Sequence, residues 1–207
     1  MKNTNEIYDF EQGSEEWQKI RIGKAGGSEI IGITTPARMK TFLYLKVAEV
    51  LTGKQEFTDY VSDDMQRGKD LEPIAVEEYE RREFVNVTKV GYVTNTEMKY
   101  AGLSPDGIVG ETGAIEIKSP RAKKHIEIIT TGKIMKEYEP QVLWLFVVMP
   151  KIQYVDFISY CPDLEIRPYH KIVLKREELE KEIAGLELSY IDFENKMDKL
   201  IKTVKTF

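Results

Sequence analysis

A turn bracketed by Gly110 and Gly113 joins two apolar-leaning runs, and this pattern constrains the fold of the 207-residue chain most. A short polar connection with glycines between such runs is typical of a β-hairpin. On the second run, Glu116 and Lys118 are two residues apart, so in a strand they share one face and the flanking isoleucines point to the other. The sequence therefore predicts a strand with one charged and one apolar face.

The hairpin register decides which residue lies opposite that charged face. If Gly110 pairs roughly with Gly113, Asp106 lies across from Glu116 and Lys118, and cross-strand neighbours are about 5 Å apart. Two carboxylates that share a divalent cation, beside one lysine, are the minimum set for metal-assisted phosphodiester cleavage. A bulge would shift this register, and a surface hairpin with an ordinary Glu–Lys pair is the alternative. The spacing thus indicates a nuclease and leaves the plain hairpin open.

Length and composition favour one globular domain over residues 1–207, with enough chain for a substantial core. The first seventeen residues lack the cationic start and apolar run of a signal peptide. The longest apolar run, 142–149, is too short to cross a bilayer. Cys161 is the single cysteine and cannot form an internal disulfide, which fits a reducing compartment. We therefore expect a cytoplasmic protein with no membrane partner.

The charge of the chain is uneven. Its net charge of −5 disfavours a simple nucleic-acid binder, which usually carries a basic excess. The segment 118–136, however, holds six Lys or Arg residues against one acid, Glu127. A basic strip beside an acidic metal site suits a polyanionic substrate. A solvated charge run is the alternative.

Apolar periodicity and capping residues predict a mixed α/β (α+β) fold, with a central mixed sheet flanked by helices. Ser14 and Ser28 are expected to cap short helices, and Pro73 is expected to bend a long one whose inner face includes Ile74 and Phe84. The C-terminal apolar stripe favours core packing over an oligomer seam. We expect helices over 15–20, 41–52, 63–84, 140–149 and 176–206. We expect an antiparallel meander over 85–93, 98–109 and 114–119, and further strands over 154–160 and 169–174.

Motifs in a fixed order along most of the chain add a family resemblance. The chain resembles the phage lambda-type alkaline exonucleases, also called YqaJ-like viral recombinase nucleases, within the PD-(D/E)xK superfamily. The residues that carry the resemblance are Glu16-Trp17, Arg21 to Lys24, Ser28, Arg67-Gly68-Lys69 with Glu72, Ser104-Pro105-Asp106-Gly107, Glu116-Ile117-Lys118-Ser119-Pro120, Tyr138 with Gln141-Val142, and the strand 155–160.

The resemblance implies a restriction-endonuclease-like core and a Mg²⁺-dependent exonuclease. Such enzymes degrade one strand of linear double-stranded DNA from the 5′ end, release mononucleotides and leave 3′ single-stranded overhangs. The resemblance also implies two Mg²⁺ ions, with Mn²⁺ as an alternative metal. It further implies a homotrimeric ring that threads the DNA and a single-strand annealing recombinase as partner.

The resemblance also assigns metal and catalytic roles to residues of this chain. Asp106 and Glu116 would hold Mg²⁺, with the Ile117 carbonyl as a further ligand, because hard cations prefer oxygen. Lys118 would orient or help deprotonate the attacking water and stabilise charge on the phosphate. Glu72 would complete the metal shell or bind a second metal, and a surface helical glutamate is its plain alternative.

The resemblance implies roles near the metal site for four further residues. Gln141 would lie at the active site, although a satisfied core glutamine is the alternative. Arg21, Ser28 and Arg38 match the family's pocket for the 5′ phosphate, where arginine offers forked donors. Gly26-Gly27 replaces a threonine-alanine pair expected there, which predicts a more mobile loop.

Two other functions compete with the exonuclease hypothesis. A structure-specific or nicking DNA endonuclease could use the same core and the same residues. A DNA-end-binding scaffold without catalysis belongs to a different class. The complete set of Asp106, Glu116, Lys118 and Glu72 disfavours the scaffold.

Overall fold

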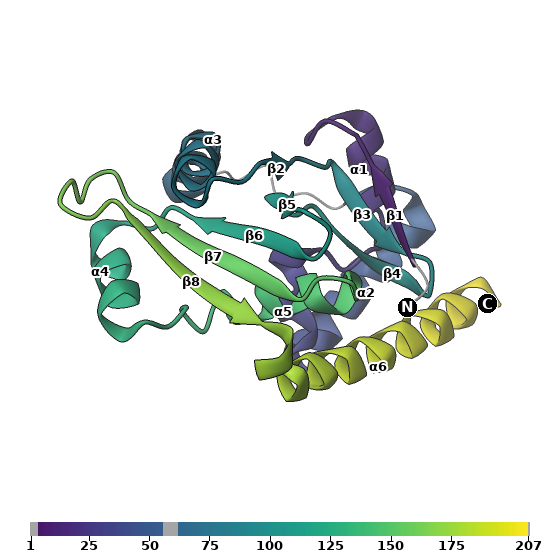
Figure 1. Ribbon diagram of the computed structural model, residues 1–207. Helices are drawn as coiled ribbons and strands as arrows, with labels where there is room; N and C mark the ends of the chain where they lie inside the picture. The colour runs from purple at the N-terminus through teal and green to yellow at the C-terminus, as the bar shows by residue number, and fades with distance from the viewer. Residues whose placement is uncertain (1–3, 56–61, 207) are drawn as a thin grey trace.

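Two β-sheets packed among helices make up the fold (Figure 1), in a computed structural model that describes residues 4–55 and 62–206. The larger sheet has the strand order β2-β5-β6-β7-β8. Strands β6 and β7 are parallel and the other neighbours are antiparallel, so the sheet is mixed. Its strands are β2 (Val87–Thr88), β5 (Gly107–Val109), β6 (Gly113–Lys118), β7 (Tyr154–Tyr160) and β8 (Tyr169–Lys175). The predicted α/β class with a mixed sheet flanked by helices is confirmed.

A second, antiparallel sheet of three strands shows that the predicted meander is wrong. Its order is β1-β3-β4, from β1 (Asn5–Tyr8), β3 (Tyr92–Asn95) and β4 (Met98–Leu103). The segments 85–93 and 98–109 therefore each divide between the two sheets. Pro105 has no N–H for a ladder. The Ser104 hydroxyl donates to the Gly91 carbonyl at 2.6 Å, which joins both crossing points.

Helix α3 (Asp63–Glu83) covers the apolar face of β6, and its buried stripe differs from the predicted one. Ala75, Val76 and Tyr79 pack against Ile115 and Ile117. Ile74 and Phe84, predicted to face inward, are 47% and 93% exposed. Phe84 has a φ of 55°, because it forms the left-handed cap that ends the helix. The buried stripe is thus rotated by about one residue, and Glu72, the acid predicted for the site, lies on the helix three residues before Ala75.

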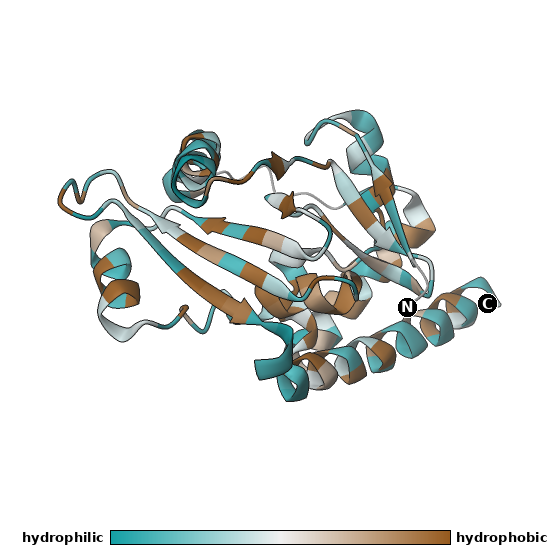
Figure 2. Cartoon of the chain, viewed as in Figure 1, coloured by the Kyte–Doolittle hydropathy of each residue, from teal (hydrophilic) through white to brown (hydrophobic). Residues whose placement is uncertain are grey.

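Helix α5 (Glu139–Val148) is the apolar centre of the molecule. Six of its ten residues are buried, and Trp144 is fully buried. It packs against 3₁₀ helix η1 (Gly27–Ile33) and against α6 (Glu180–Lys205), whose inner stripe from Ile183 to Met197 is buried. Hydropathy colouring shows this pattern as a brown core with teal outer faces on α3 and α6 (Figure 2). The expectation that the C-terminal stripe packs in the core is confirmed for these residues.

The remaining helices differ from expectation mainly at their ends. Helix α1 (Glu15–Arg21) begins at the predicted cap, because the Ser14 hydroxyl accepts from the Trp17 N–H. Helix α2 (Pro36–Thr52) ends at Gly53 as predicted but begins five residues earlier, where Thr35 caps it and Pro36 starts it. Helix α4 (Ala122–Thr131), not predicted, occupies the basic strip, and η2 (Arg176–Glu178) precedes α6. No helix of the described ranges has the length and apolar content to span a membrane.

Candidate active site

The β5–β6 hairpin brings the predicted carboxylates together. Val109 pairs with Gly113 and Gly107 with Ile115, so the next step of the register sets Asp106 beside Glu116. An Asp106 carboxylate oxygen accepts a hydrogen bond of 2.6 Å from the Ile117 N–H. The register is shifted by one residue from the predicted pairing of Gly110 with Gly113, but Asp106 still lies opposite the 116–118 stretch, as predicted.

Lys118, the last residue of β6, is at the centre of the polar contacts of the site. Its Nζ forms an ion pair with Glu116 Oε1 at 2.6 Å, and Glu116 is 1% exposed. Lys118 Nζ also donates to Gln141 Oε1 at 3.0 Å and lies 5.6 Å from the ring centre of Tyr138. Gln141 projects from the first turn of the largely apolar α5, so the structure places this amide in contact with Lys118, the lysine predicted for the site.

A cavity of about 800 Å³ opens beside this cluster. Basic residues of the 118–136 strip and Lys69 of α3 lie along its wall, so a negatively charged substrate meets cationic side chains there. Six of the nine predicted site residues line it, namely Ser28, Glu72, Asp106, Ile117, Lys118 and Gln141. Glu116 is buried next to it, while Arg21 and Arg38 do not line it.

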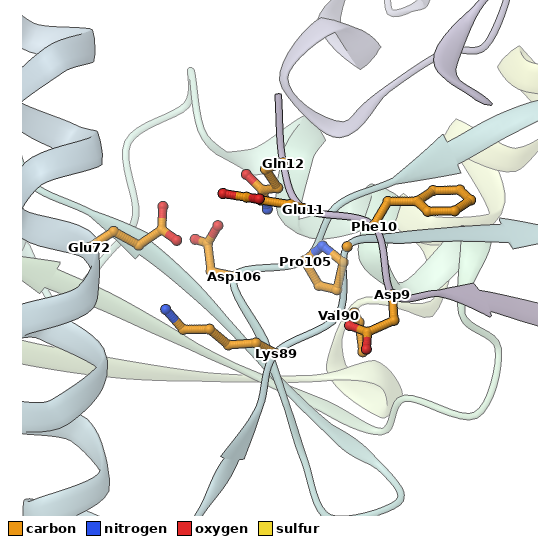
Figure 3. A pocket seen from close by; sticks show the side chains of 10 residues that line it. Asp9, Phe10, Glu11, Gln12, Glu72, Lys89, Val90, Pro105 and Asp106 are labelled. Atoms are coloured by element: carbon orange, nitrogen blue, oxygen red, sulfur yellow. The ribbon is translucent and has the colours of Figure 1, made fainter. Parts of the chain in front are cut away.

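A second cavity, of about 460 Å³, shares Glu72 and Asp106 with the first. Figure 3 shows Glu72 reaching from α3 toward Asp106, with the Lys89 side chain extending into the space beside them. Lys89 and Tyr138 were not predicted to have a role. Tyr138 was visible only as a member of a motif, and Lys89 lies outside every motif.

Burial raises the pKa of all three site carboxyls, and repulsion from neighbouring carboxylates adds to this at Glu116 and Glu72. Burial raises the pKa of Glu116 to about 8, with Lys118 acting against this and Asp106 adding to it. Burial, and then Asp106, raise the pKa of Glu72 to about 7. Burial also raises the pKa of Asp106. Lys118 is buried as well, which favours its neutral form, but Glu116 and Asp106 outweigh this and raise its pKa.

This crowding of buried acids fits a hard divalent cation. The site offers carboxylate oxygens of Asp106 and Glu116 and a nearby backbone carbonyl, which is the donor chemistry of Mg²⁺. Glu116 Oε1 is buried, and among the described residues its close partner is the Lys118 ammonium at 2.6 Å, which leaves this oxygen room for a further cationic partner. No group of three or more His, Cys, Asp or Glu in the described part of the chain is gathered closely enough to hold a metal by itself. The metal would therefore rely on two carboxylates, with Glu72 set further back.

Arg21 packs on a tryptophan that also bonds to Ser104, just before the β5–β6 hairpin. Its guanidinium lies 4.0 Å from the ring centre of Trp17. Trp17 Nε1 donates at 2.9 Å to the Ser104 hydroxyl, two residues before Asp106. The arginine and the metal-site aspartate are thus connected through one tryptophan and one serine.

Ser28 and Arg38 are placed differently from expectation. Ser28 lies exposed inside η1, and Gly26 occupies the cap position, so the predicted capping role of Ser28 is wrong. Ser28 nevertheless lines the larger cavity. At Gly27, an added Cβ would lie 3.5 Å from Gln141 Cγ, so this loop packs closely on the active site. Arg38 is exposed in the first turn of α2 and is not brought to the cavity.

A family model described as the YqaJ-like viral recombinase domain matches residues 16–149. The chain belongs to the YqaJ-like viral recombinase family. The match spans α1 through α5 and so includes every residue predicted for the site. The resemblance inferred from the motifs is thereby confirmed.

Solved structures agree with this membership. An alkaline exonuclease, LHK-Exo from Laribacter hongkongensis, is 33% identical, with 93% of this chain and 97% of that chain covered and a TM-score of 0.83. LHK-Exo in complex with dAMP gives 32% identity, coverage of 93% and 99%, and a TM-score of 0.78. A phage-related exonuclease from Haemophilus somnus 129PT shares the fold, at 14% identity, coverage of 87% and 96%, and a TM-score of 0.56. The comparison with curated proteins finds no match. Membership and likeness together support a nuclease that acts on DNA.

Proposed function

We propose that this YqaJ-family chain is a Mg²⁺-dependent exonuclease that degrades one strand of linear double-stranded DNA from its 5′ end. It would release mononucleotides and leave 3′ single-stranded overhangs. The observation that carries the proposal is the cluster of buried Glu116 with half-buried Asp106 and Lys118, which borders a cavity of about 800 Å³ with basic residues along its wall. Metal-assisted cleavage of a phosphodiester needs carboxylates that hold a cation and cationic side chains that bind the polyanionic substrate, and this site offers both.

Asp106, Glu116 and the Ile117 carbonyl would hold Mg²⁺, and Glu72 would support a second ion. Mg²⁺, when bound, supplies Lewis-acid polarisation of the phosphate and activation of a water molecule. Lys118 keeps its proton because Glu116 and Asp106 raise its pKa despite burial. Its ammonium therefore stabilises negative charge on the phosphate, and the hydrogen bond to Gln141 fixes its direction.

The proposed cut also explains why a site for a 5′ phosphate is useful. Water attacks the phosphorus between the first two nucleotides, and the bond to the 3′ oxygen of the first nucleotide breaks. That nucleotide leaves with a 3′ hydroxyl, and the second nucleotide keeps the phosphate on its 5′ oxygen. Each cut therefore regenerates a 5′-phosphorylated end for Arg21 and Ser28 to bind, whereas the position of Arg38 away from the cavity does not support its predicted part in this pocket. The capture of dAMP by LHK-Exo supports a site for a nucleoside monophosphate.

Assembly and partner belong to the same proposal. We propose a homotrimeric ring around the DNA and a single-strand annealing recombinase as the partner that takes up the overhang. A ring with the cavities turned inward would reconcile a net charge of −5 with a basic path for DNA. Light scattering on the purified chain tests the trimer, and a monomeric mass at working concentration contradicts it.

Duplexes labelled at either end, with Mg²⁺ or EDTA, test the reaction. We expect labelled mononucleotide at once from the 5′ label, late release of the 3′ label, and no product in EDTA. Closed circular duplex is the matched control and should stay intact. Rapid cutting of the circle would establish the alternative, a nicking or structure-specific endonuclease. End binding without any cleavage would establish a scaffold that has lost catalysis.

The 5′-phosphate pocket has its own test in Arg21→Ala. This variant should slow digestion of 5′-phosphorylated duplexes much more than digestion of 5′-hydroxyl duplexes, because only the former offer a dianion to the guanidinium. Equal slowing of both substrates contradicts the assigned role.

A further inference from the structure

A buried charged network lies behind the loop that carries Arg21 and Ser28. Lys46 of α2 is 1% exposed, and its Nζ lies within 3.2 Å of both carboxylate oxygens of Glu49 and both of Glu29. Glu49 is 3% exposed and Glu29 lies in η1. Buried charges cost several kcal/mol per ion before their partners compensate, so an apolar packing would serve stability as well or better. The network therefore calls for a role in positioning.

One end of the network holds the loop just after Arg21. A Glu49 carboxylate oxygen accepts the Gly23 N–H at 2.9 Å. Gly23 has a φ of +70°, and an added Cβ would lie 2.2 Å from Val50 Cγ2, so the chain passes directly against α2 there. The position two residues after Arg21 is thus fixed by a glutamate of a different helix.

The other end holds the loop just after Ser28. Glu29 follows Ser28 in η1, and its carboxylate is the part of η1 that Lys46 binds. An added Cβ at Gly26 would lie 3.3 Å from Glu29 Oε2 and 3.9 Å from Arg21 Nη2. The Glu29 carboxylate and the Arg21 guanidinium therefore face the same narrow gap across Gly26.

We propose that the Glu29–Lys46–Glu49 network is the positioning device that sets the spacing of Arg21 and Ser28, and with it the selectivity for 5′-phosphorylated DNA ends. The inference rests on the proposed function, because it concerns the phosphate end of that substrate. Lys46 bridges both ends of the loop with directional contacts, which an apolar side chain cannot supply. The two carboxylates exceed the single ammonium by one negative charge, which attracts the Arg21 guanidinium toward them before any phosphate binds.

Glu29→Gln is the variant that tests this role. The glutamate is partly exposed, so the substitution removes one charge while Lys46 keeps Glu49 as its buried partner. The measurement is the ratio of initial rates on 5′-phosphorylated and 5′-hydroxyl duplexes that are otherwise identical, with Mg²⁺. We expect the ratio to fall by roughly tenfold to a hundredfold, since a displacement of about 1 Å in a binding group costs up to ~100-fold. The rate on 5′-hydroxyl ends should change little.

Glu15→Gln is the matched control. Glu15 pairs with Lys19 at 2.6 Å on the surface of α1, the helix that carries Arg21, and both side chains are exposed. The same loss of one carboxylate charge should leave the rate ratio unchanged, because an exposed pair contributes little to position. A fall in the ratio for this control as well would attribute the effect to general charge and overturn the inference.

A double variant, Lys46→Met with Glu49→Gln, keeps the volume of the network and removes its buried charges. If it folds by circular dichroism and loses selectivity, the inference is supported; if it folds and retains selectivity, the inference is overturned. If Arg21→Ala abolishes the preference for 5′-phosphorylated ends but Glu29→Gln preserves it, this inference is overturned and the proposed function stands. A wild-type protein with no preference for 5′-phosphorylated ends overturns the end-recognition part of the proposed function together with it.

Discussion

The buried acid Glu116 gives the prediction that the structure quantifies best. Burial raises its pKa from the ordinary value of 4.5 to about 8. A carboxyl with a raised pKa contributes stability that is present at low pH and is lost as the pH rises from the unfolded value through the folded one. At about 1.4 kcal/mol per pH unit, ionised Glu116 destabilises the metal-free protein by about 5 kcal/mol at pH 9.

Glu116→Gln removes that penalty and also one partner of Lys118. The raised pKa of Glu116 already includes the attraction of Lys118, so the metal-free variant should gain about 5 kcal/mol at pH 9. For a chain of this size the melting temperature should rise by roughly 10–20 °C. At pH 5, where wild-type Glu116 is mostly protonated, this gain should disappear. Added Mg²⁺ should stabilise the wild type at pH 9 and the variant much less, because the variant lacks one carboxylate of the proposed site.

Thermal melting followed by circular dichroism at pH 5 and 9, in EDTA and in Mg²⁺, measures all four values. Glu111→Gln is the matched control, since Glu111 is exposed in the turn of the same hairpin. This control variant should show the same difference between the melting temperatures at pH 5 and pH 9 as the wild type. If Glu116→Gln lowers the melting temperature at pH 9 in EDTA, the reasoning about a penalised buried carboxylate is refuted.

Two further substitutions address catalysis. Lys118→Met should lower kcat by roughly 100-fold to 1000-fold, which is the range for loss of one charge-stabilising donor. Binding of duplex ends, measured by fluorescence anisotropy in Ca²⁺, should persist. Unchanged cleavage contradicts the role assigned to Lys118. Gln141→Leu should lower kcat by about tenfold and leave KM unchanged. The lost hydrogen bond, of about 1.5 kcal/mol, orients Lys118 and does not hold the substrate. A change confined to KM would assign Gln141 to substrate binding instead.

Local patterns determined the parts of the site that depend on one hairpin. Glycines set the turn, and the two-residue period of a strand set Glu116 and Lys118 on one face with Asp106 opposite. Helix ends followed the same logic where a side chain or a glycine decides them, as at Ser14 and Gly53. These features involve residues close in sequence, so the physics that specifies them is visible without the rest of the fold.

Long-range packing determined where the prediction was wrong. The meander divides between two sheets because Ser104 bonds to Gly91, thirteen residues away, and Pro105 cannot continue a ladder. The buried stripe of α3 depends on the apolar face of β6 that it meets, which periodicity alone leaves uncertain by about one residue. Ser28 is a residue type that often caps helices, yet η1 begins one residue before it, with Gly26 as its cap, and Ser28 lines the cavity instead.

The sequence by itself determined a hairpin with two carboxylates and a lysine, and motifs that indicated a nuclease of the YqaJ family. Only the tertiary structure decided that Lys118 bonds Gln141, that Trp17 links Arg21 to the Asp106 hairpin, and that Lys46 ties Glu49 to Glu29 behind the loop. Each of these contacts joins different elements of the fold, and several of their partners are far apart in the sequence. A local pattern records the conformation of a segment, whereas such contacts exist only after the segments have packed, which is why the sequence showed the reacting groups and the fold showed how they are held.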